Sequence, residues 1–276
     1  MIQFQSTRKP RGGLSVALSM ADIIYHSTVR NVRKKHSNAF IALGVNMLQV
    51  VIFVGVFYAM FSILGLRGSA IRGDFLIYIM SGIFLFMTHT KTLQSVVASE
   101  GPANPMMQHA PMNTIISICA AALGALYIQT LSLFLILFGY HVAVTPLEID
   151  KPIGAFTMLI VAWFGGVALG IILLAIKPWF PTVVQVATTL YMRANMIASG
   201  KMFVANSLPS FMLAMFDWNP LFHLIDQARG FAFINYVPRY SNWEYPIYVA
   251  LIMLMLGLMG EFYTRRHASA SWEARR

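Results

Sequence analysis

Long uncharged apolar runs constrain this chain more than any other feature of its sequence. The stretch 39–66 carries no formal charge, and comparable runs recur along the chain. A helix needs roughly 20 apolar residues to cross a hydrocarbon core of about 30 Å. Only 11% of the 276 residues are charged, about half the share of a typical soluble domain, so the apolar side chains must face lipid. The sequence therefore predicts an all-α integral membrane protein.

Six transmembrane helices are expected from these runs. The predicted spans are 39–66, 75–98, 114–138, 153–176, 182–201 and 247–263. No internal repeat divides the chain, so 1–276 is interpreted as a single membrane domain. Within it, 1–38 is a cytoplasmic N-terminal segment, 39–263 the membrane region and 264–276 a cytoplasmic tail.

The basic residues gather at the two ends of the chain. The stretches 1–38 and 261–276 contain Arg8, Lys9, Arg11, Arg30, Arg33, Lys34, Lys35, Arg265, Arg266, Arg275 and Arg276, against Asp22, Glu261 and Glu273. Eleven basic and three acidic residues give these segments +8 of the net charge of +10. This positive-inside pattern predicts that both termini are cytoplasmic, which requires an even number of spans. It also argues against a folded basic patch for nucleic acid.

The segment 14–32, before the first span, has the pattern of an amphipathic helix. Its apolar positions repeat at helical spacing, while Asp22, His26 and Arg30 fall on the opposite face. A basic amphipathic helix beside a span is typical of a segment that lies in the membrane interface. We predict a cytoplasmic interface helix; a solvated helix packed on a partner is the alternative.

The apolar pattern becomes irregular after Pro181. The stretch to Leu213 contains Arg193, Lys201 and Pro209 and is too long for one simple helix. We expect a fifth span followed by short re-entrant helices that dip back into the outer leaflet before the last span. Broken backbone at that depth is tolerated only where protein or a water-filled cavity surrounds it, so the break itself indicates a pathway.

Arg193 lies near the middle of the predicted fifth span. A charge there costs at least about 2.5–3.5 kcal/mol and usually faces a bundle interior or an aqueous cavity. Two roles are open: a cationic group that lines a path for an anionic substrate, or a buried partner for helix carbonyls or for Asp226. Lys91, with His89, poses the same question in the second span, although Lys91 is close enough to the cytoplasm to snorkel.

Gly166 and Gly170 form a small-x-x-x-small pattern in the fourth span. Such a pattern lets another helix approach closely. The sequence leaves open whether that helix belongs to the same chain or to a second copy.

No constellation of reactive groups suggests an enzyme. The seven histidines are scattered, the acidic residues lie mostly in loops, and Cys119 is the single cysteine, so we predict no catalytic residue and no metal site. The phosphate-binding pattern G-x-x-x-x-G-K-[ST] is absent from the sequence. The chain is therefore not expected to hydrolyse ATP by that route or to bind a cofactor of its own.

A recognisable motif follows the fifth span. It reads Trp218-Asn219-Pro220-Leu221, then His223, Asp226 and Arg229. This W-N-P-L-x-H-x-x-[DE]-x-x-R form resembles the permease subunit of ABC-2 type exporters, and most of all the branch that exports capsular and other cell-surface polysaccharides. The resemblance extends to the whole plan of an interface helix, six spans, a short inner loop after the second span and a re-entrant segment before the last.

The motif residues also suggest a physical role. Pro220 fixes a helix start, and Asn219 before it can accept hydrogen bonds from free backbone donors. His223, Asp226 and Arg229 repeat at three-residue spacing along one helical face, where Asp226 and Arg229 can pair. A functional role and a purely structural brace for the broken segment are both open for these residues.

The resemblance implies several partners. Members of the family are homodimers that dock two ATP-binding cassette subunits on the cytoplasmic side, and those subunits bind the ATP and Mg²⁺. The loop 99–113 would be the coupling element. In it Glu100 can cap a short helix, while Met106, Met107 and His109 offer an adaptable surface for a groove on the ATPase; a loop that only reverses the chain is the alternative. Periplasmic and outer-membrane export proteins are further candidate partners.

The expected function is that of the permease of an ATP-driven exporter of lipid-linked capsular or other surface polysaccharide in a bacterial cytoplasmic (inner) membrane. On this interpretation Arg193 and Lys201 lie on the translocation path and meet phosphate or acidic sugars. The alternatives are an ABC-2 exporter of a drug, lipid or other small amphiphile, a membrane-embedded transferase, and a scaffold subunit that transports nothing.

Overall fold

The computed structural model describes residues 13–34, 39–65, 71, 73–101 and 113–267. Within these ranges the chain forms helices, turns and irregular segments but no strand. The helices are α1 (Gly13–Lys34), α2 (Ala39–Ile63), α3 (Phe75–Val97), α4 (Thr114–Ala143), α5 (Pro152–Ile176), α6 (Pro181–Ala198), α7 (Ser210–Phe216), α8 (Pro220–Ala232) and α9 (Glu244–His267), with a short 3₁₀ turn at Ala205–Ser207. The predicted all-α class is confirmed.

Five of these helices, α2, α3, α4, α5 and α9, are long and apolar enough to cross a membrane. They match five of the six predicted spans and mark the chain as a membrane-embedded helical protein. The remaining predicted span, 182–201, corresponds to α6, which ends earlier, at Ala198. Polar residues within α6, among them Gln185, Arg193 and Asn195, make it less apolar than the other five. A sixth crossing therefore stays a prediction.

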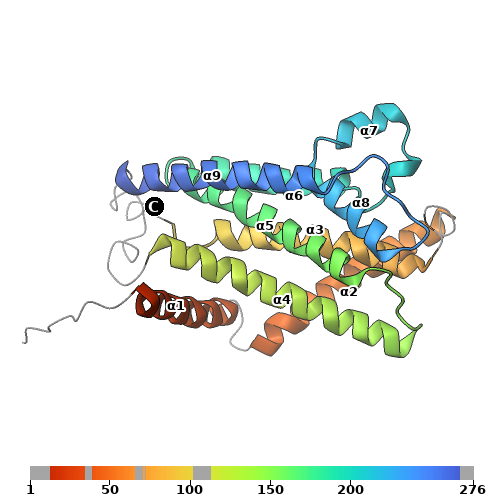
Figure 1. The fold of residues 1–276 in the computed structure, drawn as a ribbon, viewed down its shortest axis with the longest axis horizontal. Helices are drawn as coiled ribbons and strands as arrows, with labels where there is room; N and C mark the ends of the chain where they lie inside the picture. Colours follow the sequence, from red (N-terminus) through yellow and green to blue (C-terminus); the bar gives the residue numbers. More distant parts are fainter. Residues whose placement is uncertain (1–12, 35–38, 66–70, 72, 102–112, 268–276) are drawn as a thin grey trace, which may run out of the picture.

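The bundle has two distinct ends (Figure 1). The end at which α1 lies, together with the last residues of α9, is called here the α1 end. The opposite end carries α7 and α8 and is called the α8 end. The short turn 177–180 joins α5 to α6, and Pro181 occupies the first turn of α6. This Pro-rich turn sends α6 back from the α1 end.

Helices α3 and α5 form the centre of the bundle. α3 buries residues around its whole circumference, including Ile79, Ile83 and Leu93, and α5 packs against α3, α8 and α9. The outer faces of α2 and α9 instead expose large apolar side chains, such as Ile52 and Met255. An apolar surface of this kind fits contact with lipid or with a second membrane helix rather than with water.

Glycines let α5 approach α3 closely. A Cβ atom on Gly166 would lie 2.5 Å from the His89 carbonyl oxygen, and one on Gly170 would lie 2.8 Å from the Cβ of Val96. Both contacts are within the chain. The small-x-x-x-small pattern therefore serves packing between α5 and α3 in this protein.

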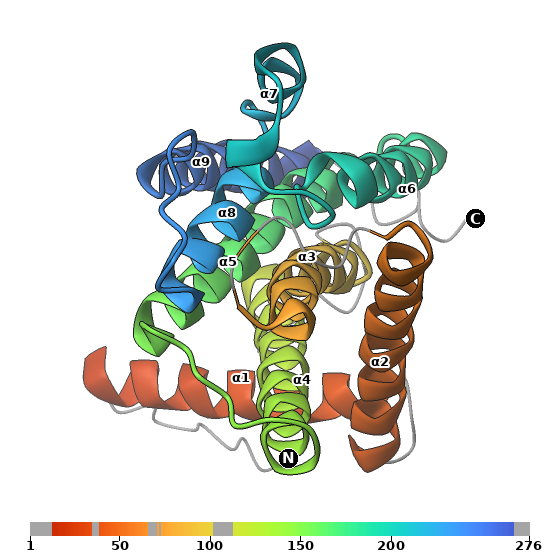
Figure 2. The same cartoon turned by 90° about the vertical axis from the view of Figure 1, so that its right-hand side faces the viewer.

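The amphipathic segment before the first span forms α1, which lies crosswise to α4 (Figure 2). It packs on α4, where Gly124 leaves room for Val32 and Thr28. Leu18 and Tyr25 are 64% and 63% exposed. α1 thus packs on its own chain while it keeps apolar side chains on its surface, a combination that suits a helix at a membrane interface.

Candidate functional site

Asn219 joins the start of α8 to the end of α6. Its side-chain oxygen accepts a hydrogen bond from the backbone N–H of Leu221 at 3.1 Å, and Pro220 occupies the first turn of α8. Its Nδ2 donates to the side-chain oxygen of Asn195 and to the carbonyl oxygen of Ala198, each at 2.9 Å. The predicted helix cap is confirmed, and the same side chain also satisfies a carbonyl that is left free where α6 ends.

The guanidinium group of Arg229 holds the turn that follows α6. Its side chain is only 1% exposed. Nη1 donates to the carbonyl oxygens of Gly200 at 2.9 Å and Phe203 at 2.7 Å, and Nη2 donates to that of Lys201 at 2.8 Å. The group also lies 4.2 Å from the centre of the Tyr78 ring. One buried cation thus binds three carbonyls of the turn after α6; of these, the Gly200 oxygen also accepts the backbone N–H of Phe203, at 3.4 Å.

Asp226 does not pair with Arg229 in this structure, although the spacing of the two residues allows it. The Asp226 oxygens accept hydrogen bonds from the hydroxyl groups of Tyr236 and, at 2.7 Å, Ser241. Burial and then the Asp226 carboxylate raise the pKa of Tyr236, so its phenol keeps the proton that it donates. Although the two charges lie three residues apart on α8, they hold different loops, Asp226 the one before α9 and Arg229 the one after α6.

His223 and Trp218 complete the motif. Nδ1 of His223 accepts a hydrogen bond from the backbone N–H of Asn242 at 3.0 Å, so Nε2 carries the proton and donates to the Asp217 carbonyl oxygen at 2.5 Å. Trp218 is 66% exposed, and its indole N–H donates to the Met215 carbonyl oxygen at 2.7 Å. These contacts support the bracing role that the sequence left open.

Arg193 lines an open groove between α2, α3 and α6, called here the α2–α6 groove. The groove has a volume of about 400 Å³ and is lined by Gln49, Ile52, Phe53, Phe86, Met87, Thr90, Lys91, Gln94, Thr189, Met192, Arg193 and Met196. Arg193 is exposed, and no hydrogen bond or ion pair joins it to the part of the chain that the structure describes. Asp226 is bound elsewhere, so the alternative of a buried partner for Asp226 does not hold.

Lys201 lies behind the groove rather than on its surface. Its side chain is 3% exposed. Nζ is 3.6 Å from the ring centre of Phe86, 5.2 Å from that of Phe57 and 5.4 Å from that of Phe53. Nζ has no hydrogen-bond partner among the described residues. Because Phe53 and Phe86 also line the groove, two aromatic rings separate the Lys201 ammonium from it.

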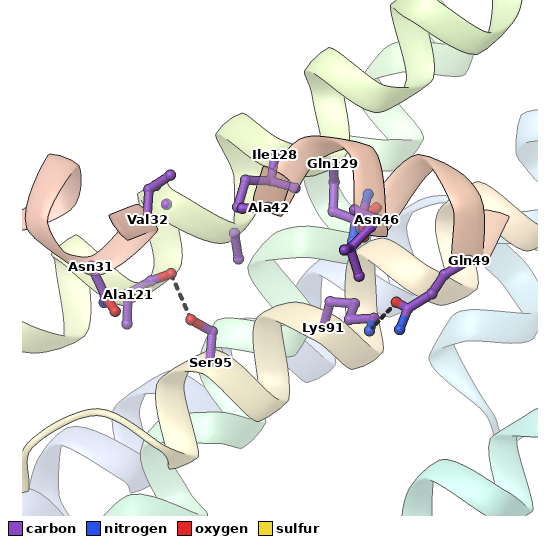
Figure 3. Close-up of a pocket in the computed structure, with 13 residues that line it drawn as sticks. Asn31, Val32, Ala42, Asn46, Gln49, Lys91, Ser95, Ala121, Ile128 and Gln129 are labelled. Atoms are coloured by element: carbon purple, nitrogen blue, oxygen red, sulfur yellow. Dashed lines mark hydrogen bonds between the residues drawn. The ribbon is translucent and has the colours of Figure 1, made fainter. Parts of the chain in front are cut away.

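A hydrogen bond joins Lys91 to Gln49 in the lining of a second cavity (Figure 3). Lys91 Nζ donates to Gln49 Oε1 at 2.7 Å. Both residues line the α2–α6 groove and also the second cavity, which has a volume of about 210 Å³ between α1, α2, α3 and α4. The two residues therefore form a shared wall, in which Lys91 brings a positive charge to both spaces.

Polar side chains within the apolar helices build this second cavity. Gln129 Nε2 donates to Asn46 Oδ1 at 3.2 Å, and Asn46 Nδ2 donates to Ser132 Oγ at 2.8 Å, which links α2 to α4. All three residues are buried. Sequence reasoning missed them, although Asn46 with Gln49, and Gln129 with Ser132, each form a polar pair three residues apart in an otherwise apolar run.

His89 connects three helices at the centre of the bundle. Nδ1 donates to the carbonyl oxygen of Ala162 in α5 at 3.0 Å, which leaves Nε2 to accept a hydrogen bond from the Tyr191 hydroxyl of α6 at 2.8 Å. Its position on α3, against α5 and α6, gives this residue, whose role the sequence did not explain, a structural function.

The predicted coupling residues lie mostly outside the described part of the chain. Met106, Met107 and His109 fall in the range 102–112, which the structure does not describe. Glu100 is described and lies at the α1 end, where its backbone N–H donates to Ser117 Oγ at 3.2 Å. It lines a cavity of about 200 Å³ together with Lys177. The coupling role stays a prediction.

Within the described ranges, no three histidine, cysteine, aspartate or glutamate residues gather as a metal ion would require. The structure thus brings the motif residues together as a brace at the α8 end and separates them from Arg193, which faces the α2–α6 groove. No family model and no curated protein compared with this sequence matches it.

Proposed function

We propose that this chain is the permease subunit of an ATP-driven exporter of the ABC-2 type, which moves a lipid-linked surface polysaccharide across a bacterial cytoplasmic membrane. In this proposal α6 is a sixth crossing, the α1 end is cytoplasmic, and α7 and α8 form the re-entrant segment. Two copies of the chain form the path, and two separate ATP-binding cassette subunits supply the energy.

The observation that carries the proposal is the exposed Arg193 in the α2–α6 groove. A cation at this depth is costly unless it faces water, an anion or a protein partner, and no described residue of the chain neutralises it. Lys91 lines the same groove. Two cations along one groove suit a substrate that carries phosphate or acidic sugars.

The outer faces of α2 and α6 support a second copy beside the groove. On α2, Ile52 and Val56 are 53% and 60% exposed, and on α6, Val183 and Leu190 are 61% and 60% exposed. A second copy packed against these faces would close the groove into a channel and cover Arg193 from lipid. Lys201 would join the path when the rings of Phe53 and Phe86 move aside.

Energy coupling belongs to the α1 end in this proposal. α1, the loop 99–113 and the turn 177–180 would meet the ATPase subunits there. Glu100 and Lys177 share a cavity at this end, and Lys177 Nζ donates to the Val97 carbonyl oxygen at 2.8 Å. A displacement of the loop 99–113 would therefore be transmitted directly to the end of α3, and through Lys177 to the turn that precedes α6.

Reconstitution with the cognate ATPase tests the proposal. The complex is placed in vesicles, and ATP hydrolysis is measured with defined lipid-linked glycans. We expect a lipid-linked glycan to stimulate hydrolysis and the glycan alone to have no effect, because both the lipid and the charged linkage contribute to binding. Equal hydrolysis with and without every glycolipid tested would contradict a polysaccharide exporter.

One further observation favours a second candidate, an exporter of a drug, lipid or other small amphiphile. A cavity of about 370 Å³ lies between α3, α4, α5 and α8, with lining side chains that are almost all apolar, such as Phe84, Leu133 and Phe156. An apolar cavity of this size suits an acyl chain or a small amphiphile. In the same ATPase assay, stimulation by simple amphiphiles but not by glycolipids would support this candidate instead.

A further inference from the structure

The cavity between α1, α2, α3 and α4 has no task in the proposed export path. Its volume of about 210 Å³ is below the range of about 300–1,000 Å³ that is usual for drug-sized ligands. A ligand of the size of a lipid head group would fill it. In the view of Figure 3, Asn31 of α1 lies at one end of the cavity, and Gln49 and Lys91 lie at the other.

The lining of this cavity combines one cation with several carboxamides. Lys91 supplies the positive charge, and no aspartate or glutamate is among the lining residues. The carboxamides belong to Asn31, Asn46, Gln49 and Gln129. A carboxamide can both donate and accept hydrogen bonds, so this set fits a ligand that bears hydroxyl groups as well as a negative charge.

Gln129 carries a buried acceptor that the described residues leave without a partner. Its side chain is 2% exposed, and its Oε1 has no hydrogen-bond partner among the described residues. A buried acceptor without a partner costs about 1–3 kcal/mol, and this one belongs to the wall of a polar cavity. The oxygen itself is closed to water in this conformation, so a rotation of the carboxamide would bring it to a hydroxyl group of a bound ligand.

The cavity lies about two helical turns from the ends of α2 and α3 at the α1 end. Asn46 is two turns into α2, which begins at Ala39, and so lies about 10 Å from that helix end at 1.5 Å per residue. Lys91 lies at a similar distance from Val97, where α3 ends. The interfacial layer of a bilayer is roughly 5–8 Å thick on each side, so a head group drawn slightly inward would reach both residues.

We propose that this cavity binds a phosphoglycerol group, that is, a phosphate ester with free hydroxyls. The phosphate oxygens lie beside Lys91, and the hydroxyls bond to Gln129 and to the other carboxamides. The inference rests on the cavity alone and holds whatever the chain transports. A glycerol phospholipid and soluble glycerol phosphate share this chemistry, and the experiment separates them.

The experiment uses the full-length protein in nanodiscs. In the first arm, nanodiscs contain phosphatidylglycerol and phosphatidylcholine in equal amounts, and native mass spectrometry counts the lipids that stay bound. We expect about tenfold enrichment of phosphatidylglycerol, the effect of about 1.4 kcal/mol of binding preference. In the second arm, phosphatidylcholine nanodiscs receive glycerol 3-phosphate, and its binding is measured from the thermal midpoint of unfolding.

Three variants test whether the ligand binds in this cavity. K91Q removes the charge, and Q49E places a carboxylate beside Lys91 at almost unchanged size, so both should abolish the preference. R193Q removes a cation that lines the α2–α6 groove but not the cavity, and should leave the preference unchanged. If K91Q fails to fold, Q49E decides the result.

Enrichment of phosphatidylglycerol that Q49E abolishes supports the lipid as the ligand. A shift of the midpoint with glycerol 3-phosphate that Q49E abolishes supports the soluble ester. The proposal is overturned if neither ligand binds, or if binding is the same in wild type and in Q49E.

Discussion

The Nζ atom of Lys91 lies 2.7 Å from the Oε1 atom of Gln49, and this hydrogen bond joins α3 to α2. The two residues line both the α2–α6 groove and the second cavity, which lies between α1, α2, α3 and α4. The charge of Lys91 therefore lies next to the proposed substrate path and also next to the cavity proposed to bind phosphoglycerol. Changes at Lys91 therefore affect both, whereas changes at Arg193 act on the groove alone.

Arg229 should be among the residues most important for stability. R229Q removes a buried cation from three backbone carbonyls, and hydrogen bonds to a charged group contribute about 1.5–3 kcal/mol each. We expect the free energy of unfolding to fall by about 3 kcal/mol or more, measured as thermal or denaturant unfolding in detergent. R239Q, a change at an exposed arginine before α9, is the control, and equal stability of the two variants would refute the bracing role.

Gly166 should tolerate no side chain. In G166A the new Cβ would lie 2.5 Å from the His89 carbonyl oxygen. Because a backbone atom cannot move away without shifting the helix, we expect the free energy of unfolding to fall by about 1–3 kcal/mol. G139A is the matched control in α4, where a Cβ would meet nothing within 4 Å. That variant should gain up to about 1 kcal/mol from helix propensity. Unfolding of the two variants side by side gives the comparison, and a stable G166A would mean that α3 and α5 are not packed so closely.

Asn219 combines a helix cap with a bond to α6, and two variants separate these tasks. N219A should lose both and lower the free energy of unfolding by about 2 kcal/mol. N219D keeps an acceptor for the Leu221 N–H but loses the donors to Asn195 and Ala198. We expect N219D to be no more stable than N219A. Wild-type stability in N219D would show that the bond to α6 contributes nothing.

Lys201 offers a test that separates transport from stability. K201M keeps a long side chain among the rings of Phe53, Phe57 and Phe86 and removes an ammonium group that has no hydrogen-bond partner within the described residues. Replacement of a buried charge by an apolar side chain is often neutral or stabilising. We expect unchanged or higher stability together with reduced export, and full export by K201M would remove Lys201 from the proposed path.

The apolar runs predicted five helices well because a long apolar run in lipid has few alternatives to a helix. The ends of some helices differ from the predicted ends of the spans. α4 continues to Ala143, five residues past the predicted end, and α9 begins at Glu244, before the apolar run. Asn219 and Pro220 were also predictable, because a helix cap depends on neighbours in the sequence.

The contacts made by buried charges could not be predicted in the same way. Asp226 and Arg229 share a helix, but which loop covers each of them depends on the tertiary packing. Gln129 and Asn46 are 83 residues apart in the chain, so their hydrogen bond leaves no local pattern. The same holds for the aromatic rings around Lys201, which come from α2 and α3.

The most direct test of the central claim is ATP-dependent export by Arg193 variants. Vesicles carry the complex of this chain with its ATPase, and the lipid-linked polysaccharide that crosses the membrane is measured for wild type, R193K and R193A. Because Arg193 makes no hydrogen bond or ion pair with the described residues, both variants should fold. We predict that R193A reduces export about tenfold or more, the effect of one charged contact of about 1.4 kcal/mol, and that R193K retains much of it. Wild-type export by R193A would contradict the account.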